Sequence, residues 1–174
     1  TDPYSNPSVG SLPNQNIWNS ELQSTLTSVI GNSNYDMGHL LANTISSNDV
    51  GGGGDAGCIG CICDSGKGSA YTASPNNDPE GDDFDIDFVC HEMGHQLGAT
   101  HTFSHIVENS GVNVEPGSGS TIMGYAGITQ DNVQANSDAY FHYSSINQIL
   151  NSLDAKTTCG TSENITNNTA PTIA

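Results

Sequence analysis

Apolar residues recur at helical spacing near both ends of the chain. Ile17, Leu22, Leu26 and Ile30 lie near one face, and this spacing predicts an amphipathic helix over residues 14–30. A second such pattern covers residues 145–153, where Ser145 and Gln148 have the spacing of a capping box. Both segments are expected to bury one face and expose the other.

The most regular apolar pattern lies in the middle of the chain. It predicts a helix that Asp83 or Asp85 caps at the start and that Gly98 ends. The apolar positions follow the i, i+3, i+4, i+7 rule at Ile86, Val89, Cys90, Met93 and Leu97.

Shorter apolar runs predict strands in the first half. They cover residues 35–41, residues 58–63 and an extended piece within residues 67–72. The stretch after the central helix is rich in Asn, Gly and Ser and is expected to be mostly irregular. The pattern predicts one α/β domain over residues 1–160, followed by a linker-like tail over residues 161–174.

Charge narrows the range of partners. The chain of 174 residues carries 19 acidic and 2 basic side chains, a formal net charge of −17. Nucleic acids and anionic membranes are excluded as partners because both need Lys or Arg. No apolar run reaches the roughly 18 residues that span a bilayer. The chain is expected to be a monomer.

Within the central helix the chain reads HExxHxxGxxH over residues 91–101. His91 and His95 are four residues apart, about 40° round a helix, so both imidazoles can bind one metal ion. His101 would lie about 240° round a continuing helix and could not reach that ion. The helix must therefore break, and Gly98 can adopt the positive φ that a break requires.

Glu92 lies beside the two helix histidines on the helical wheel. Three neutral imidazoles suit zinc, which keeps a fourth position open and activates water. Glu92 is positioned to take the proton of that water during attack on a peptide bond and to return it to the leaving amine.

This motif resembles that of the metzincin zinc peptidases, and STIMGY at residues 120–125 resembles their Met-turn. NYDMGHLL, the glycine run, EPGSGSTIMGYAGI and NSDAYFH are most similar to adamalysin or reprolysin-like secreted bacterial peptidases. The resemblance covers most of residues 1–160. It implies a small twisted mixed sheet, an active-site helix below a cleft and an irregular C-terminal part. The family's N-terminal strands are expected to be missing from this chain.

The resemblance also implies roles for individual residues. Met123 would support the zinc site, and Tyr125 would either stabilise the developing negative charge or form part of the substrate pocket wall. Cys63 and Cys159 would form a disulfide. Thr102 stands where the snake-venom branch has Asp, so that branch's substrate preferences do not carry over.

The remaining histidines and cysteines allow more than one interpretation. His105 follows His101 by four residues and could form a second metal clamp with it, but it is expected to be a solvated loop residue. His39 and His142 are expected to be structural. Residues 58–63 hold a CxxCxC pattern, and disulfides are favoured over a metal site. Cys90 is expected to pair with Cys58 or Cys61.

Two further segments have weaker interpretations. The acidic run at residues 78–87 could bind calcium, but a solvated turn that leads into a helix N-terminus is favoured. The glycine run before Cys58 lacks the Lys of a phosphate loop. By resemblance it is an edge strand that borders the cleft, to which a peptide could add as an extra strand.

Taken together, these patterns predict a secreted zinc endopeptidase with the ligands His91, His95 and His101. Its expected partners are protein or peptide substrates, and the net negative charge would favour encounter with basic peptides. Five cysteines fit an oxidising compartment. The alternative is a zinc-containing binding or adhesion domain of a larger surface protein, with little turnover.

Overall fold

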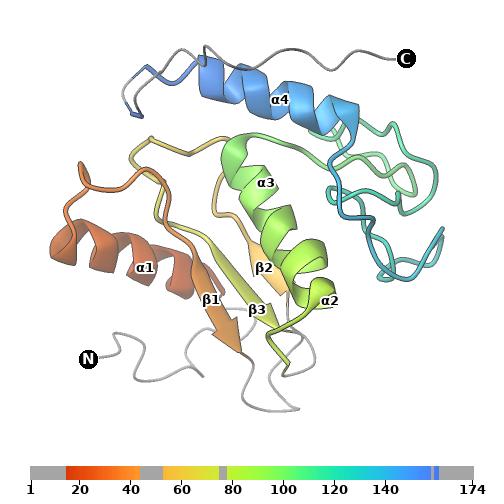
Figure 1. The fold of residues 1–174 in the computed structure, drawn as a ribbon, viewed down its shortest axis with the longest axis horizontal. Helices are drawn as coiled ribbons and strands as arrows, with labels where there is room; N and C mark the ends of the chain where they lie inside the picture. Colours follow the sequence, from red (N-terminus) through yellow and green to blue (C-terminus); the bar gives the residue numbers. More distant parts are fainter. Residues whose placement is uncertain (1–14, 44–52, 75–77, 158, 161–174) are drawn as a thin grey trace, which may run out of the picture.

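The fold is taken from a computed structural model, which describes residues 15–43, 53–74, 78–157 and 159–160. The helices and strands of these residues form a small α/β structure, as expected from the sequence (Figure 1). In chain order they are α1 (Gln15–Val29), β1 (Leu40–Asn43), β2 (Gly53–Asp55), β3 (Tyr71–Ser74), α2 (Asp82–Phe84), the π-helix η2 (Asp85–Cys90), α3 (His91–Leu97) and α4 (Tyr143–Asp154).

The three strands form one mixed sheet in the order β1-β3-β2. β1 runs parallel to β3 with Leu40 opposite Tyr71, and β2 runs antiparallel to β3 with Gly54 opposite Thr72. Helix α1 packs against the sheet through Trp18, whose ring meets that of Tyr71 edge to face at 5.1 Å. Burial of all four β3 residues follows from this central position.

Two of the predicted strands are wrong in position. The run at 35–41 becomes a strand only at Leu40, because Gly38 N donates to Lys67 O in the turn before β3 and the preceding residues follow bends. Residues 58–63 form turns rather than a strand, since a disulfide joins Cys58 to Cys61 and Gly60 has a φ of 69°. The observed second strand lies in the glycine run and at an edge of the sheet, as the family resemblance implies.

Helices α2, η2 and α3 follow one another without a break, so the predicted central helix is present over residues 82–97. Neither Asp83 nor Asp85 caps it, because Gly81 occupies the N-cap position and no side chain accepts a hydrogen bond there. Gly98 ends it as predicted, with a φ of 118°. Six residues in the middle are wound as a π-helix, a form that often accompanies functional sites.

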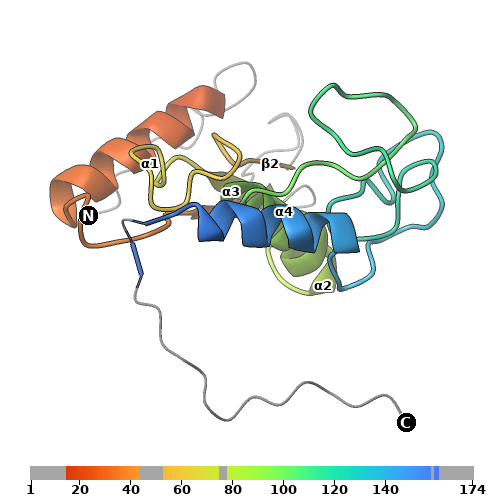
Figure 2. The same ribbon diagram turned by 90° about the horizontal axis from the view of Figure 1, so that it is seen from above.

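Helix α4 lies alongside the C-terminal end of α3 (Figure 2). It begins earlier than predicted, at Tyr143, because the His142 side chain caps it by accepting a hydrogen bond from Ser144 N. The Ser145–Gln148 capping box is therefore wrong, and Gln148 instead bonds Thr100 N and Oγ1. Between α3 and α4 lies a second apolar core: Ile86, Cys90, Ala99, Ile122, Met123, Phe141 and Ile149.

Residues 99–142 are mostly irregular, as expected, and form a lobe on the side of α3 away from α1 (Figures 1 and 2). Among the described residues, no helix is long and apolar enough to cross a membrane. The tail at residues 161–174 and any element before α1 lie outside the residues that the structure describes.

Candidate metal centre

The three histidines of the motif meet beside the end of α3. His91 and His95 project from α3, and the chain turns at Gly98 so that His101 returns toward them. The ring centroids are 4.7–5.2 Å apart. Their candidate ligand atoms all lie within 4.8 Å of one another. One further group in the described part of the chain meets this criterion, but it contains the bonded sulfurs of Cys63 and Cys159.

Each imidazole is held through its Nδ1 atom. His91 Nδ1 lies 2.6 Å from Ile122 O, and His95 Nδ1 lies 2.8 Å from Ala99 O. His101 Nδ1 lies 2.7 Å from a carboxylate oxygen of Glu108. Because an acceptor faces each Nδ1 atom, the three rings are held in place and their Nε2 atoms are left to bind a metal. This is the usual arrangement around a protein-bound metal.

The distances fit a tetrahedral metal ion. His95 Nε2 and His101 Nε2 are 3.1 Å apart, and two nitrogens bound at about 2.0–2.1 Å in tetrahedral geometry are roughly 3.3 Å apart. Burial and the neighbouring imidazoles lower the pKa of His91 to about 3, and burial and His101 lower that of His95 to about 4. Both rings are therefore neutral at pH 7, which is the form that binds a metal.

Glu92 is buried beside these histidines, with 8 % of its surface exposed. Burial and the charge of Asp55 raise the pKa of its carboxyl to about 8, although a backbone hydrogen bond from Ala56 acts in the opposite direction. The side chain packs against β2 so closely that a Cβ at Gly54 would lie 2.2 Å from Glu92 Cγ. The glycine run is thus what allows the sheet edge to approach this carboxylate.

The turn that contains Met123 packs against α3 at Gly94, between His91 and His95. Met123 is fully buried, and a Cβ added at Gly94 would lie only 2.5 Å from its sulfur. The Tyr125 ring lies 4.6 Å from that of His101 and 5.6 Å from that of His91. Burial and the nearby charges of Glu108 and Glu92 raise the pKa of Tyr125 to about 12, so its phenol is protonated at neutral pH.

The sequence matches the model of the reprolysin-like metallopeptidase family M12B over residues 2–153. The chain belongs to this family. The family that the motif and its flanking residues resemble is therefore confirmed, and the group of three histidines fits the metal of a metallopeptidase. Searches of curated proteins and of solved structures give no significant match.

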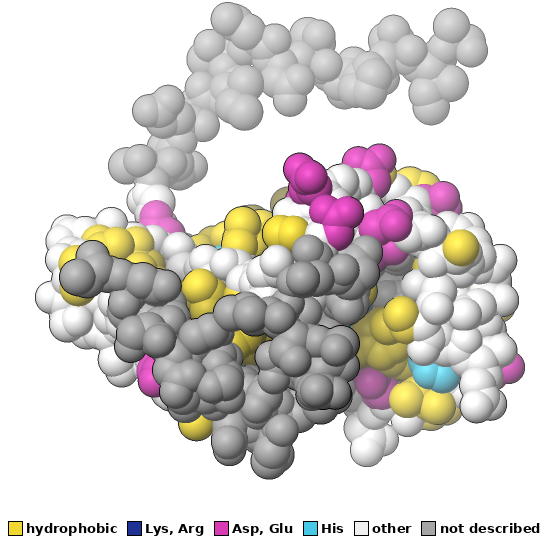
Figure 3. All heavy atoms as spheres, turned by 90° about the horizontal axis from the view of Figure 1, so that it is seen from below, with side chains coloured by type: hydrophobic (Ala, Val, Ile, Leu, Met, Phe, Trp, Pro, Cys, Tyr) yellow, Lys and Arg dark blue, Asp and Glu magenta, His cyan; other side chains and the backbone are white. Residues whose placement is uncertain are grey.

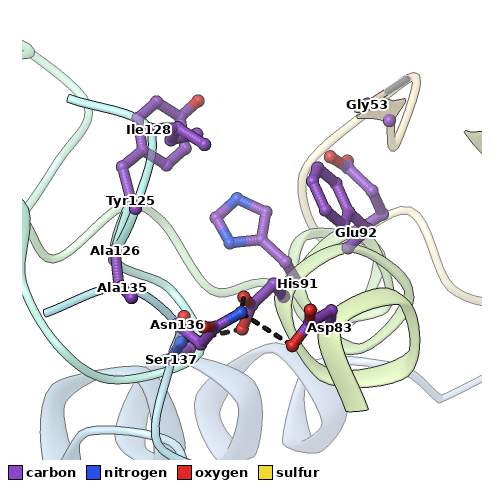
Figure 4. A pocket seen from close by; sticks show the side chains of 15 residues that line it. Gly53, Asp83, His91, Glu92, Tyr125, Ala126, Ile128, Ala135, Asn136 and Ser137 are labelled. Atoms are coloured by element: carbon purple, nitrogen blue, oxygen red, sulfur yellow. Dashed lines mark hydrogen bonds between the residues drawn. The ribbon is translucent and has the colours of Figure 1, made fainter. Parts of the chain in front are cut away.

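Two cavities of this peptidase meet at Glu92. One, of about 360 Å³, lies between α3 with η2 and the segment after Met123, and His91, Glu92 and Tyr125 line it (Figure 4). The other, of about 700 Å³, is open to solvent and lies between the β2 edge and residues 107–110. A polypeptide could therefore cross the site with side chains in both cavities.

The other histidines of the peptidase lie outside the metal group. His105 is not the solvated residue expected from the sequence, because it packs on Phe103 at 4.5 Å between ring centroids and its Nδ1 atom is buried. His39 bonds Gln96 Oε1 and Thr72 Oγ1 at 2.7 and 2.8 Å, joining α3 to the sheet. This contact and the cap at His142 are structural, as expected.

The disulfides are Cys58–Cys61 and Cys63–Cys159, and the second is the pairing that the family resemblance implies. The expected disulfide between Cys90 and Cys58 or Cys61 is wrong, because the Cys90 thiol is free in the core between α3 and α4. The loop that Cys58 and Cys61 close has a role at the site. Gly60 N in the loop donates to His95 O, and Ile62 N just after it donates to Gln96 O, so this segment satisfies carbonyls at the end of α3.

The acidic run forms no calcium site in the described residues, because none of its carboxylates lies in a group of three or more candidate metal ligands. Asp83 and Asp87 instead accept hydrogen bonds from Asn136. Sequence reasoning missed Glu108 and Asn136 because both come from the irregular lobe, where no periodic pattern places a side chain. The one available signal was a carboxylate seven residues after the last motif histidine.

Proposed function

We propose that this chain is a secreted zinc endopeptidase in which His91, His95 and His101 bind zinc and Glu92 is the general base. The observation that carries the proposal is the convergence of three imidazoles whose Nδ1 atoms are all occupied by protein acceptors. Zinc, when bound, supplies a Lewis acid that polarises the peptide carbonyl.

The chain's own residues supply the proton transfers. Glu92 lines both cavities. Without a metal its pKa is about 8, and a zinc cation beside it would favour the ionised carboxylate. That carboxylate accepts a proton from the attacking water and then delivers it to the departing amine. Tyr125 lines both cavities as well, and its hydroxyl donates a hydrogen bond to the negative charge that develops on the carbonyl oxygen. Met123 positions His91 and His95 from below by packing against Gly94 between them.

The substrate is a protein or peptide chain that crosses both cavities. The β2 edge offers backbone groups beside Glu92 for an extended peptide. Two disulfides support secretion, since such bonds persist in oxidising compartments. We also propose that residues 1–160 act as one catalytic domain and a monomer.

A pair of measurements tests the proposal. Glu92→Gln is expected to lower kcat for a fluorogenic peptide about 100- to 10,000-fold, because general acid–base catalysis contributes that much. It is expected to retain about one zinc per chain, as measured by atomic absorption, because Glu92 is not a ligand. Unchanged cleavage in Glu92→Gln would overturn the assigned role. Stoichiometric zinc without cleavage by the native protein would favour the alternative, a zinc-containing binding domain.

A further inference from the structure

The cavity lined by His91 and Glu92 differs in character along its length. Its walls are mainly apolar, formed by Phe88, Ala126, Ile128 and Ala135. One end is polar and contains Asp83, Asp87, Asn136 and Ser137. Figure 4 shows the His91 ring between this polar end and the side where Tyr125, Ile128 and Glu92 lie.

The polar end holds two carboxylates that share one neutral donor. Asn136 Nδ2 donates to Asp83 Oδ1 at 2.8 Å and to Asp87 Oδ2 at 3.1 Å. The other Asp87 oxygen accepts from Ser137 N at 2.8 Å. These donors are amides and leave two negative charges without a cation.

The two lysines of the chain are used elsewhere. Lys67 is buried above the Tyr35 ring at 4.8 Å, and Lys156 pairs with Asp64. Neither lines the cavity, and the sequence contains no Arg. A cation at the polar end must therefore come from a bound molecule.

The spacing along the helix suits a long side chain. Asp87 lies four residues before His91 and Asp83 four before Asp87, so the three residues follow one side of η2 and α3 about one turn apart. A Lys or Arg side chain that enters beside His91 would lay its aliphatic stem along the apolar walls. Its charged head would then reach Asp87 and Asp83.

We propose that this cavity is a specificity pocket for a Lys or Arg residue next to the scissile bond, with Asp83 and Asp87 as the residues that recognise its charge. This inference rests on the proposed function and adds the substrate class. Asn136 is a positioning residue that holds the two carboxylates together at the end of the pocket.

The surface around the pocket agrees with this assignment. A second, smaller cavity shares Asp83 and Phe88 with the pocket and is lined by further acidic residues, Asp78, Glu80 and Asp82. Figure 3 shows acidic side chains gathered on this underside of the molecule, with no Lys or Arg visible in the view. A basic side chain would therefore approach through a region of negative potential.

The first experiment compares peptides that differ at one position. A peptide mixture is digested and the cut sites are mapped by mass spectrometry, and a fluorogenic peptide is then made with Lys, Gln or Met at the position that flanks the cut. The native protein is expected to show kcat/KM at least about tenfold higher for Lys than for Gln or Met, the size of a charge-assisted hydrogen bond. Equal values for the three peptides would overturn the proposal.

Variants then identify the residues that cause the preference for Lys. Asp83→Asn/Asp87→Asn is expected to lower kcat/KM for the Lys peptide about tenfold or more and to leave the Met peptide nearly unchanged. Asp85→Asn removes one negative charge, as Asp83→Asn alone does, from an exposed position outside the pocket, and it is expected to keep the preference. A Lys preference that survives the double substitution would place the recognition elsewhere, as at Asp55 in the other cavity, and would overturn the proposal.

Two controls separate the possible failures. Asp83→Asn alone changes an exposed side chain and keeps the test available if the double variant does not fold. Competition of the native protein by lysine amide, with norleucine amide as the uncharged match, probes the pocket without any substitution, and equal inhibition by the two would count against it. Absence of cleavage of every peptide would instead count against the proposed function.

Discussion

At the residue scale, the metal centre is defined by what holds each histidine. Two imidazoles are fixed by backbone carbonyls, Ile122 O and Ala99 O, which substitution cannot remove. The third is fixed by a side chain, Glu108, from the irregular lobe. Of the three proposed ligands, His101 is also the one that the helix does not position, so its orientation depends most on this one carboxylate.

Glu108→Ala is expected to weaken zinc binding about 10- to 100-fold, because loss of a hydrogen-bond partner behind a ligand costs that much in other metal sites. The zinc dissociation constant is measured by competition with a chromogenic chelator. Glu80→Gln removes an exposed carboxylate outside the site and serves as the control. Equal zinc affinity in Glu108→Ala and the native protein would show that the carboxylate does not position His101.

The residues of the site differ in how far the sequence could place them. His91, Glu92 and His95 belong to one helix, whose geometry follows from spacing alone, and Gly98 explains the return of His101. Glu108 and the Asn136 that bridges Asp83 and Asp87 are brought in by a lobe without periodicity. Their positions depend on tertiary packing, which no local pattern reports.

At the element scale, the turn that carries Met123 is organised by one buried glutamate. Glu115 has 6 % of its surface exposed, and its carboxylate accepts from Ser120 N at 3.0 Å, Thr121 N at 3.1 Å and Thr121 Oγ1 at 2.5 Å. Burial acts to raise the pKa of Glu115, but these hydrogen bonds outweigh it and hold the pKa below 4.5. The ionised form therefore stabilises the turn.

Because the folded pKa of Glu115 is below its unfolded value, its contribution to stability is present above pH 4.5 and is lost as the pH falls through the folded pKa. Glu115→Gln is expected to lower the free energy of unfolding at pH 7 by about 1–3 kcal/mol. The deficit is expected to shrink as the pH falls below 4.5. Urea unfolding of both proteins between pH 7 and pH 3 measures this, and parallel pH profiles would contradict it.

The bend that separates α3 from His101 depends on Gly98. Its φ of 118° is unfavourable for other residues, and an added Cβ would lie 2.5 Å from Ser152 Cβ on α4. Gly98→Ala is expected to cost about 1–3 kcal/mol for the backbone and a similar amount for the overlap. It is also expected to weaken zinc binding, because His101 follows the bend.

Gly81→Ala is the matched comparison, since Gly81 has a φ of 87° but, among the described residues, no atom lies within 4 Å of an added Cβ. It should cost only the backbone share, about 1–3 kcal/mol, and leave zinc affinity unchanged. Urea unfolding and chelator competition are measured on both variants. Equal losses of stability in the two would contradict a packing role for Gly98.

The elements themselves were predicted where one apolar face persists over several turns. Residues 15–29 and 82–97 have such faces and form helices close to the expected bounds. Strands were predicted less well, because Gly53–Asp55 pairs through backbone groups and has no apolar alternation. The CxxCxC segment has apolar character but is closed into turns by its disulfide.

At the scale of the whole molecule, two small cores lie on either side of the metal centre. Trp18, Tyr71 and Ala73 form one between α1 and the sheet, and Ala99, Ile122 and Met123 form the other between α3 and α4. The buried contact of His39 with Gln96 and Thr72 joins α3 to the sheet. Ion pairs contribute little to the stability of the fold. The described residues contain two, Lys156–Asp64 and, when the imidazole is protonated, His101–Glu108.

With a net charge of −17 and so few ion pairs, the folded chain repels itself at low ionic strength. Raising NaCl from 0.01 to 0.5 M shortens the screening length from about 30 Å to below 10 Å. Tm is therefore expected to rise, by about 2–4 °C for each 1 kcal/mol of repulsion removed. A Tm that is constant or falls with salt would contradict the role assigned to net charge.

Over the same range of NaCl concentration, kcat/KM for a Lys peptide is expected to fall, because screening weakens attraction of the basic substrate. The Met peptide is the control, and its kcat/KM should change little with salt.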